Sequence, residues 1–536
     1  MFAIRRWLAL LATIITSVLH FLTTAPGSID DAFILLVYAR HLVHGGALYY
    51  NQQDLPVDGF TSPLDLLIKS AVMRLSHADP ISVTWWVSLI LHVGVALFGF
   101  HLAEWLARRQ RLESPLVIAT VAGLVLGSAQ ALGDGSAFLL ETPLWVLLGL
   151  AATSVVLFAP PVQPTAQVAL GALLIAVLLA RPEGLALSLM LLVLLVRERR
   201  WLIAGSIFTV GAAVYYFWHI HKFGYWAPNT YYAKTSASRW NELRDGLQYV
   251  ADFAQSRGVM SLAWLVFAPL AVRGFLDSRM RQRFLLITLL SWAMLGVAIY
   301  SGGDCYSGGR FLALALALAT VGLVVAVIHL DRRSARFAWA VLSVQLGVQM
   351  VLLVVSVIST FALSKEPVRV PLSERAFACD RAASVAVANL LTDRPGAVVA
   401  QTDFQRMKYF VDEQYVRDLS GLNDQRIAHR RVDGPVVWGK HELIEAARMR
   451  PEVMILGHHI GANARAMGHF SLAAVFRDEA LHSDFFGYGV APPIAEALIA
   501  AYVTASVPVC GGYFNFLLRR DVASALRPLG TVVTEP

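Results

Sequence analysis

Charged residues are scarce in this chain, and their scarcity excludes several classes of protein. Only 15% of the 536 residues are Asp, Glu, Lys or Arg, whereas 57% are hydrophobic. Soluble domains carry roughly 25% charged residues, so a single large water-soluble enzyme is excluded. Disordered chains and coiled coils are excluded as well, because they need abundant charge or a heptad pattern instead of long apolar runs. The composition predicts a polytopic membrane protein, with or without a soluble appendage.

Cysteine is nearly absent, and the basic residues are not gathered into one patch. The three cysteines, Cys305, Cys379 and Cys510, are too few for a disulfide scaffold, and they show no CxxC or His/Cys metal spacing. The net charge is +7, from 44 Lys and Arg against 37 Asp and Glu. These basic residues stand in short clusters between apolar runs, which is the pattern that orients a protein in a bilayer. We therefore expect the lipid bilayer, and no nucleic acid, as a partner.

Long apolar runs are abundant, and a helix needs roughly 20 such residues to cross the hydrocarbon core. No small-residue cleavage site precedes Asp30, so the first run is predicted to be an uncleaved anchor. The sequence predicts about eleven crossings, of which the fifth and sixth are short, at residues 7–24, 84–106, 116–132, 143–158, 168–180, 185–196, 201–218, 260–272, 284–300, 311–330 and 337–363.

The basic clusters predict which way these crossings run. With Arg5 and Arg6 in the cytoplasm, eleven crossings place every later cluster on the same side, at residues 108–111, 197–200, 273–283 and 332–336. The opposite loops hold acids and aromatic residues instead. We therefore expect the chemistry of the protein on the outer face of the membrane.

The composition changes to that of a soluble domain from about Ser364, so we divide the chain into a membrane domain, residues 1–363, and a second domain, residues 364–536. Short apolar strands at 397–400, 416–419 and 453–456 alternate with helical segments such as 440–448, which is typical of a small α/β layer. The odd number of crossings places this domain outside, in the periplasm. Cys379 and Cys510 either pair there or are buried as free thiols.

Two adjacent carboxylates, Asp30 and Asp31, follow the first crossing. They repel each other, so the pKa of one should be raised unless a cation compensates. One of them is either a general base, with its neighbour orienting substrate or holding a divalent cation, or an ordinary helix cap. Arg40 on the predicted surface helix either binds a phosphate or pairs with these acids. Asn51 falls in the turn after that helix.

Three charged residues stand at the outer ends of predicted crossings. Glu141 opens a crossing, where an acid is an ordinary signal for a helix start. Arg181 and Glu183 lie between two short crossings. They form either a tight outer turn with a surface salt bridge or the wall of a polar cavity that a ligand needs.

Two outer loops carry further candidates. Residues 223–234 are densely aromatic. They form either an interfacial belt of aromatic side chains or a platform on which Tyr231 and its neighbours stack against a sugar. An interfacial belt would not require Asn229 or Lys234. Residues 301–310 form a Gly-rich loop that contains Asp304 and ends at Arg310. Such a loop suits an anion or is merely flexible.

The motifs occur in a fixed order: IDDAF with Arg40 and Asn51, DGFTSPL, ETPL, ARPEG, APNTYYAK, GGD with GGRFL, and DLSGL at 418–422. The ordered set, which spans Arg5 to Asn423, resembles the polytopic GT-C glycosyltransferases related to the mycobacterial terminal β-(1→2)-arabinofuranosyltransferase. Two features depart from the family: Cys305 and Tyr306 follow the GGD motif, and the last domain is shorter.

The resemblance implies transfer of a sugar, arabinofuranose in those relatives, from a polyprenyl-phosphate carrier to a glycan, lipid or protein acceptor outside a bacterial plasma membrane. It implies an inverting reaction in which Asp30 or Asp31 is the base. A phosphate leaves without a proton, so positive charge is the help it needs, and the candidates are Arg40, Lys234 and Arg310. The resemblance also implies a sugar-binding cavity, to which we assign Asn51, Glu141, Arg181, Glu183, Asn229, Tyr231 and Asp304.

Two other functions compete with this interpretation. A transporter or flippase for a lipid-linked sugar would need similar outer residues, but also polar residues at mid-membrane depth, and the apolar runs are nearly free of them. A membrane anchor whose soluble domain binds a partner leaves the acidic pair and the Gly-rich loop unexplained. No His cluster calls for zinc, and the spacing neither requires nor forbids a divalent cation at Asp30 and Asp31.

Overall fold

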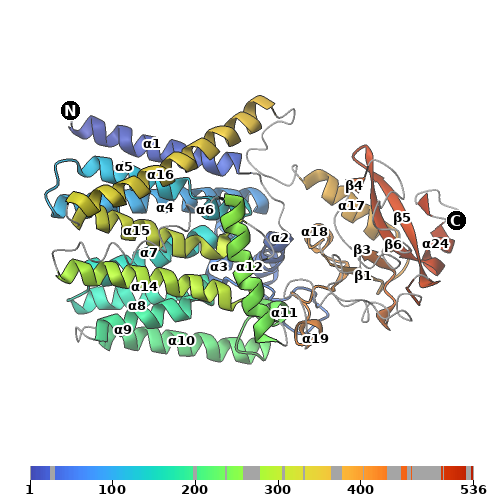
Figure 1. Ribbon diagram of the computed structural model, residues 1–536. Helices are drawn as coiled ribbons and strands as arrows, with labels where there is room; N and C mark the ends of the chain where they lie inside the picture. Colours follow the sequence, from blue (N-terminus) through green and yellow to red (C-terminus); the bar gives the residue numbers. More distant parts are fainter. Residues whose placement is uncertain are drawn as a thin grey trace.

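The computed structural model describes residues 2–24, 30–196, 202–235, 238–257, 278–304, 308–329, 332–363, 377–402, 404–430, 448–455, 460–461, 497–498, 500–526 and 533–534. The chain is mainly helical and has two parts, a bundle of long helices and a smaller domain with a β-sheet (Figure 1). Short helices lie where the two parts meet.

Within the described residues, six helices are long and apolar enough to cross a membrane. They are α1 (Phe2–Thr23), α4 (Pro80–Arg109), α10 (Leu202–Phe223), α14 (Ser278–Tyr300), α15 (Ala313–His329) with the turn Arg310–Leu312 before it, and α16 (Arg332–Val357). A further span arises if α5 (Pro115–Gly127) and α6 (Gln130–Ala137), which are bent by 48°, act as one. Three apolar helices are shorter: α7 (Thr142–Phe158), α8 (Pro164–Ala180) and α9 (Gly184–Val196).

The predicted crossings fall on these helices, apart from residues 260–272, which lie outside the described residues. The count of eleven therefore stays a prediction. Proline begins several of the helices, since the first helical position needs no N–H donor. In α4, for example, the Asp79 carboxylate accepts from the Ser82 N–H at 2.8 Å, directly before Pro80. The crossing predicted at 116–132 is not straight, because it breaks between α5 and α6.

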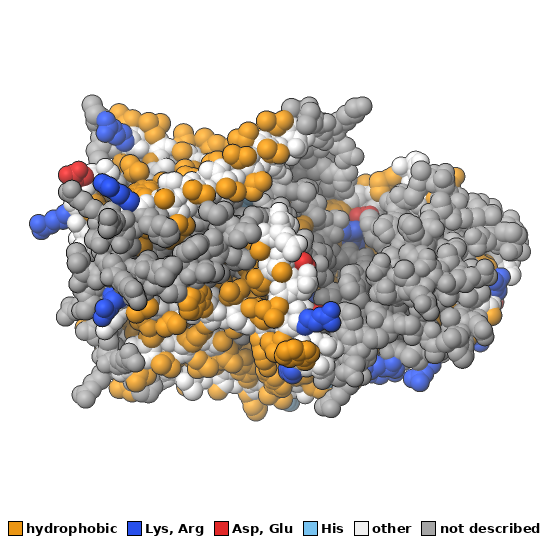
Figure 2. Space-filling model, in the orientation of Figure 1, with side chains coloured by type: hydrophobic (Ala, Val, Ile, Leu, Met, Phe, Trp, Pro, Cys, Tyr) orange, Lys and Arg blue, Asp and Glu red, His pale blue; other side chains and the backbone are white. Residues whose placement is uncertain are grey.

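The outer surface of the bundle matches a membrane protein. Hydrophobic side chains are prominent over the described part of the visible face of the bundle, and several Lys and Arg side chains lie at its end away from the sheet domain (Figure 2). At one such place Arg6 donates to Glu104 at 3.1 Å, and Arg108 donates to the same carboxylate at 2.6 Å. Two of the predicted cytoplasmic clusters, those at the start of the chain and at the end of α4, therefore meet.

The C-terminal part is a mixed sheet in the order β2-β1-β3-β6-β5-β7, with β4 also paired to β6. The parallel strands are β1 (Val398–Gln401), β2 (Tyr415–Asp418) and β3 (Val453–Ile455), and the antiparallel ones are β4 (Ile460–Gly461), β5 (Tyr502–Val509), β6 (Gly512–Arg519) and β7 (Val533–Thr534). The sheet is accompanied by α17 (Ala378–Asn389), α18 (Arg406–Phe410), α19 (Gln425–Ala428) and α24 (Arg520–Leu526). The three strands expected from the sequence are confirmed, whereas the β5–β6 hairpin was not predicted. The helix expected at 440–448 lies outside the described residues except for its last residue. The predicted domain boundary at residue 364 lies outside them as well.

Helix α2 (Asp30–Gly45) joins the two parts. The ring of Phe33 packs edge-on against Phe377 and Tyr409, with centroids 5.1 and 5.3 Å apart. Further along the helix, His41 Nε2 lies 2.8 Å from the Asp412 carboxylate. The helix that carries the predicted acidic pair is therefore packed against the sheet domain over most of its length.

A disulfide joins Cys379 in α17 to Cys510 in the turn between β5 and β6, with the two Cα atoms 5.7 Å apart. Of the two alternatives left by the sequence, the pairing is confirmed and the free thiols are excluded. The bond closes a loop in which the two cysteines are 131 residues apart. It fastens α17 to the turn of the β5–β6 hairpin.

Removing this disulfide should loosen the hairpin. Closing so long a loop restricts the unfolded chain, so the double variant Cys379→Ser/Cys510→Ser should lose about 2–5 kcal/mol of stability in the sheet domain. Amide hydrogen exchange in β5 and β6 of the full-length protein measures this loss. Wild type treated with reductant should behave like the double variant, and Cys305→Ser is the control. Equal protection in all four samples would contradict the expected stabilisation.

Candidate active site

A cavity of about 430 Å³ opens beside α2 at the end of the bundle that faces the sheet domain. Its walls come from α2, from the N-terminal end of α9, from α11 (Asn229–Lys234) and from the C-terminal end of α14. Much of the lining is apolar. The charged and phenolic residues in it are Asp31, Glu141, Arg181, Glu183, Tyr231, Lys234, Tyr300 and Arg310.

Asp31 faces two cations in this cavity. Its Oδ2 lies 3.3 Å from Nη2 of Arg310 and 3.8 Å from Nζ of Lys234. Burial alone would raise the pKa of Asp31, but the charges of Lys234 and Arg310 outweigh it and hold that pKa below its ordinary value. The carboxylate is therefore ionised at neutral pH, and 22% of its side chain is exposed toward the cavity.

Arg310 is fixed from behind by Asp304. Its Nη2 donates to Asp304 Oδ1 at 2.9 Å, its Nε donates to the other oxygen, and Asp304 is only 1% exposed. The chain reaches this position through Gly309, whose φ is +80°. A Cβ atom there would lie 2.3 Å from the ring of Phe253, so only glycine fits. The Gly-rich loop thus places one guanidinium between two carboxylates.

A second charged group, centred on Arg181, also lines the cavity. Arg181 donates to Glu141, and its Nη2 donates to Glu183 Oε1 at 3.0 Å. Burial would raise the pKa of Glu183, but Arg181 holds it below its ordinary value. The backbone also forms a tight turn, in which the Gly184 N–H donates to the Arg181 carbonyl at 2.9 Å. The turn is confirmed, but its salt bridge is buried and not on the surface. Arg181 and Glu183 also line the cavity, and their role toward a ligand stays a prediction.

Three of the predicted site residues bind the sheet domain instead of lining the cavity. Arg40 donates to the Tyr409 carbonyl at 2.5 Å and lies over its ring. The Asn51 amide donates to the Val416 carbonyl at 2.9 Å. The Asn229 amide donates to the carbonyls of Gly421 and Leu422, at 2.8 and 2.9 Å. Their polar groups are used in joining the two parts of the chain, which is the reason these side chains are held away from the cavity.

The acidic pair is described only in part. Asp30 is the first residue of α2, and its side chain lies outside the described residues. A divalent cation shared by Asp30 and Asp31 therefore stays a prediction. Two basic side chains already face Asp31, and their charge opposes a metal ion at that carboxylate. Among the described residues, no group of three or more His, Cys, Asp or Glu side chains could hold a metal.

A buried pair that sequence reasoning missed holds the aromatic segment. Asp58 Oδ2 lies 2.6 Å from Nε2 of His219, and its Oδ1 accepts the Asn229 N–H at 3.1 Å. Burial raises the pKa of Asp58 although the hydrogen bond from His219 opposes it. Asp58 thereby fixes the start of α11, the helix that carries Tyr231 and Lys234. The only sequence signal was its place in the DGFTSPL motif.

A second buried pair supports the cavity near Glu141. In α3 (Pro63–Ser76), Lys69 binds Asp65 at 2.6 Å and donates to the Leu139 carbonyl at 2.9 Å. Leu139 has a φ of +60°, a conformation that is unfavourable for leucine and needs such support. Leu139 and Leu140 line the cavity directly before Glu141. In the sequence, this pair could have been found from an Asp and a Lys that stand four residues apart in an otherwise apolar helix.

The long apolar helices and the charged cavity at one end of the bundle define a polytopic membrane protein with a ligand-sized cavity. No protein-family model and no curated protein matches the sequence. Among solved structures, the chain is similar to ArnT from Cupriavidus metallidurans bound to undecaprenyl phosphate, at 16% identity and a TM-score of 0.43, over 82% of this chain and 79% of that chain. It is similar to the apo state of that protein at 16% identity and a TM-score of 0.44, with the same coverage.

Proposed function

We propose that the chain is a glycosyltransferase of the GT-C type, which moves a sugar from a polyprenyl-phosphate donor to an acceptor at the outer face of the membrane. The observation that carries this proposal is the placement of Asp31 between Arg310 and Lys234 in a cavity whose other walls are largely apolar. Such a cavity combines a base, positive charge for a phosphate, and surface for a lipid chain. The ordered motifs of the sequence support the same class.

The reaction is a single displacement. The acceptor hydroxyl oxygen attacks the anomeric carbon while the bond from that carbon to the phosphate oxygen breaks, so the configuration inverts. The electron pair of the broken bond stays on the polyprenyl phosphate, whose charge Arg310 and Lys234 stabilise. Asp31 takes the proton of the acceptor hydroxyl. Glu141, Arg181, Glu183 and Tyr231 line the space in which the sugar hydroxyls are bound.

The two cations also control the strength of the base. Without donor, Lys234 and Arg310 neutralise Asp31 and lower its pKa. Arg310 is fixed by Asp304, but Lys234 is 30% exposed and contacts Asp31 only at 3.8 Å. A donor phosphate draws Lys234 away from Asp31, so the pKa of Asp31 rises when the donor is bound. The carboxylate then becomes a better base when it is needed.

The orientation follows from the basic clusters. Arg6 and Arg108 meet at Glu104, near the start of α1, which lies at the end of the bundle remote from the sheet domain (Figure 1). The positive-inside rule places that end in the cytoplasm, and the cavity and the sheet domain in the periplasm of a bacterial plasma membrane. The disulfide between Cys379 and Cys510 supports an oxidising compartment for the sheet domain.

A transfer assay tests the proposal. Purified full-length protein is given a panel of polyprenyl-phosphate sugars, including arabinofuranose, with glycan, lipid and peptide acceptors. We expect one donor to be consumed with inversion at the anomeric carbon, which would also name the sugar. Tight binding of one donor without transfer or hydrolysis would contradict the proposal and favour a transporter of lipid-linked sugar.

Replacing Lys234 by alanine should weaken donor binding and shift the pH profile. Loss of a charged contact to phosphate should raise KM for the donor roughly 10- to 100-fold. The substitution also removes one of the cations that lower the pKa of Asp31, so this pKa should be higher than in wild type. Asp31 should therefore become protonated, and activity should be lost, at a higher pH than in wild type. Measuring kcat/KM between about pH 4 and 8 tests both effects. Lys222→Ala, an exposed lysine at the end of α10, is the control, and an unchanged KM in Lys234→Ala would remove this residue from the donor site.

A further inference from the structure

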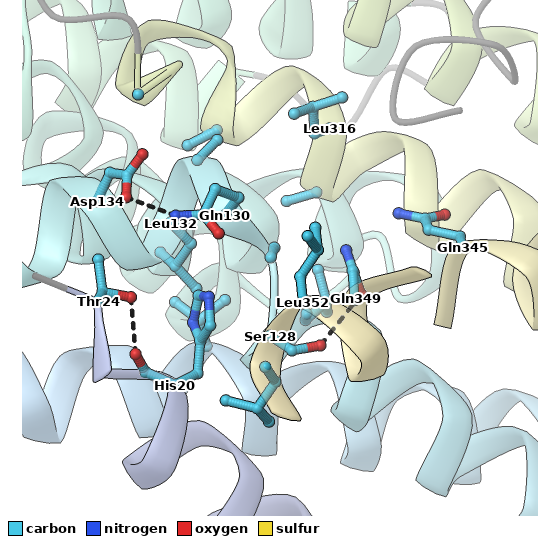
Figure 3. A pocket seen from close by; sticks show the side chains of 18 of the residues that line it. His20, Thr24, Ser128, Gln130, Leu132, Asp134, Leu316, Gln345, Gln349 and Leu352 are labelled. Atoms are coloured by element: carbon cyan, nitrogen blue, oxygen red, sulfur yellow. Dashed lines mark hydrogen bonds between the residues drawn. The ribbon is translucent and has the colours of Figure 1, made fainter. Parts of the chain in front are cut away.

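A second and larger cavity, of about 640 Å³, lies inside the helical bundle. It is bounded by the C-terminal end of α1, by the break between α5 and α6, by the start of α15 and by the second half of α16 (Figure 3). It shares none of its described lining residues with the charged cavity beside α2. We call it the bundle cavity.

The bundle cavity is lined by hydroxyl and amide groups among apolar side chains. No Lys or Arg occurs among its described lining residues, and its only carboxylate there, Asp134, accepts from Gln130 Nε2 at 2.7 Å. The charged cavity, in contrast, holds three cations, Arg181, Lys234 and Arg310. A phosphate is therefore favoured in the charged cavity, whereas an uncharged group with hydroxyls suits the bundle cavity. Its polar lining residues are His20, Thr23, Thr24, Ser128, Gln130, Asp134, Thr320, Gln345, Gln349 and Ser356.

Gln345 points to a ligand in this cavity. Its side chain is only 7% exposed, and its Oε1 has no hydrogen-bond partner among the described residues. A buried amide oxygen without a partner costs stability, so its retention in a membrane-spanning helix needs a cause. Gln349, one turn further along α16, is hydrogen-bonded to Ser128 at 3.1 Å. Figure 3 shows both glutamines on α16 and the hydrogen bond between Ser128 and Gln349.

The cavity reaches the lipid-facing side of the bundle. Val348, Leu352 and Val355 of α16 line it, and α16 is the least buried of the six long apolar helices in the described part of the chain. On another side, the helix break at Ser128 and Ala129 forms part of its wall. Irregular backbone at membrane depth is tolerated where it lines a cavity, and broken helices often form binding sites there. A lipid can thus place its chain against α16 and its head group inside.

One short segment forms part of the walls of both cavities. Gly308 lines the bundle cavity and Arg310 lines the charged cavity. Gly308 packs directly on Asp134, since a Cβ atom added to it would lie 2.5 Å from Asp134 Oδ2. The two cavities are therefore neighbours, separated at this place by the residues that lead into α15.

We infer that the bundle cavity binds the acceptor, and that this acceptor is a lipid whose uncharged head group carries several hydroxyl groups. The inference rests on the proposed function and narrows the acceptor from a glycan, lipid or protein to a lipid-borne polyol. In this arrangement Gln345 and Gln349 bind hydroxyls of the head group, and transfer requires one hydroxyl to pass the wall that Gly308 to Arg310 form between the two cavities.

Photolabelling tests this binding without any transfer step. The probes are octyl β-D-glucoside with a diazirine on the octyl chain, and octyl phosphate with the same diazirine, applied to the full-length protein in vesicles. We expect the glucoside to label peptides of α6 and α16 saturably, with competition by unlabelled octyl glucoside and not by octyl phosphate. Gln345→Leu should reduce this labelling at least about fivefold, which corresponds to the loss of one hydrogen bond. Val344→Leu, at an exposed position of α16 that does not line the cavity, should leave it unchanged.

Three results would overturn the inference: labelling without saturation, equal saturable labelling by octyl phosphate, or unchanged labelling in both Gln345→Leu and Gln349→Leu. Because Gln349 is only half-buried, Gln349→Leu is the variant to measure if Gln345→Leu folds poorly.

The photolabelling result and the proposed glycosyltransferase function can be tested separately. Sugar transfer without saturable glucoside labelling refutes only the acceptor site, whereas labelling without transfer by any donor refutes the glycosyltransferase.

Discussion

Asp31→Asn should lower the turnover number for sugar transfer by about 10² to 10⁴, the usual contribution of a general base. The amide keeps the shape of the side chain but cannot take the acceptor proton. Arg310 keeps its bond to Asp304, so membrane insertion and yield should match wild type. Initial rates at saturating donor and acceptor measure the effect.

The control for this experiment is Asp521→Asn, at an exposed carboxylate of α24 in the sheet domain. Its turnover should equal that of wild type. Asp30→Asn is measured in parallel, because the sequence does not distinguish the two acids as bases. Normal turnover in Asp31→Asn would exclude this residue as the base, and a loss confined to Asp30→Asn would move the role to its neighbour.

Arg310→Ala should affect both stability and donor binding. The variant leaves the carboxylate of Asp304 buried and unpaired, which should cost about 3–5 kcal/mol in the free energy of unfolding. It also removes the cation that we assign to the donor phosphate. Denaturant unfolding in detergent measures the first effect, and equilibrium binding of a polyprenyl phosphate measures the second.

The double variant Arg310→Ala/Asp304→Ala separates these two roles. With both charges gone, most of the lost stability should return, because no unpaired charge stays buried. Donor affinity should stay low, since the phosphate still lacks its partner. Wild-type affinity in the double variant would mean that Arg310 and Asp304 only hold the Gly-rich loop in place.

The sequence predicted the membrane helices and the charged cavity better than it predicted the role of single polar residues. Length and hydropathy suffice to predict a membrane-spanning helix, and Asp31, Lys234 and Arg310 were found because each is a charged residue in a loop between two predicted crossings. Asn51 and Asn229 were assigned to substrate, but they bind backbone carbonyls of residues far along the chain. No local pattern distinguishes an amide that binds a sugar from one that binds a distant strand.

The bundle cavity was missed for a related reason. Gln345 and Gln349 lie in an apolar run whose mean hydropathy is high, so averaging concealed two amides on one helix face. The sequence also predicted membrane runs nearly free of polar groups, and the cavity corrects that expectation. Likewise, the β5–β6 hairpin escaped prediction because its two-residue turn, Cys510 and Gly511, both with positive φ, lacks the Asn-Gly or Asp-Gly pair that usually marks such a turn.

The attachment of α2 to the sheet domain affects how the protein should lose activity on heating. Asp31 stands on a helix held through Phe33, Arg40 and His41 by side chains and backbone of the sheet domain. If that domain melts first, the membrane bundle can survive intact while the base loses its alignment. Inactivation would then precede unfolding of the bundle. The helical bundle without the sheet domain would be folded but inactive. The sheet domain would thus serve as a template that keeps α2, and with it the carboxylate of Asp31, in position.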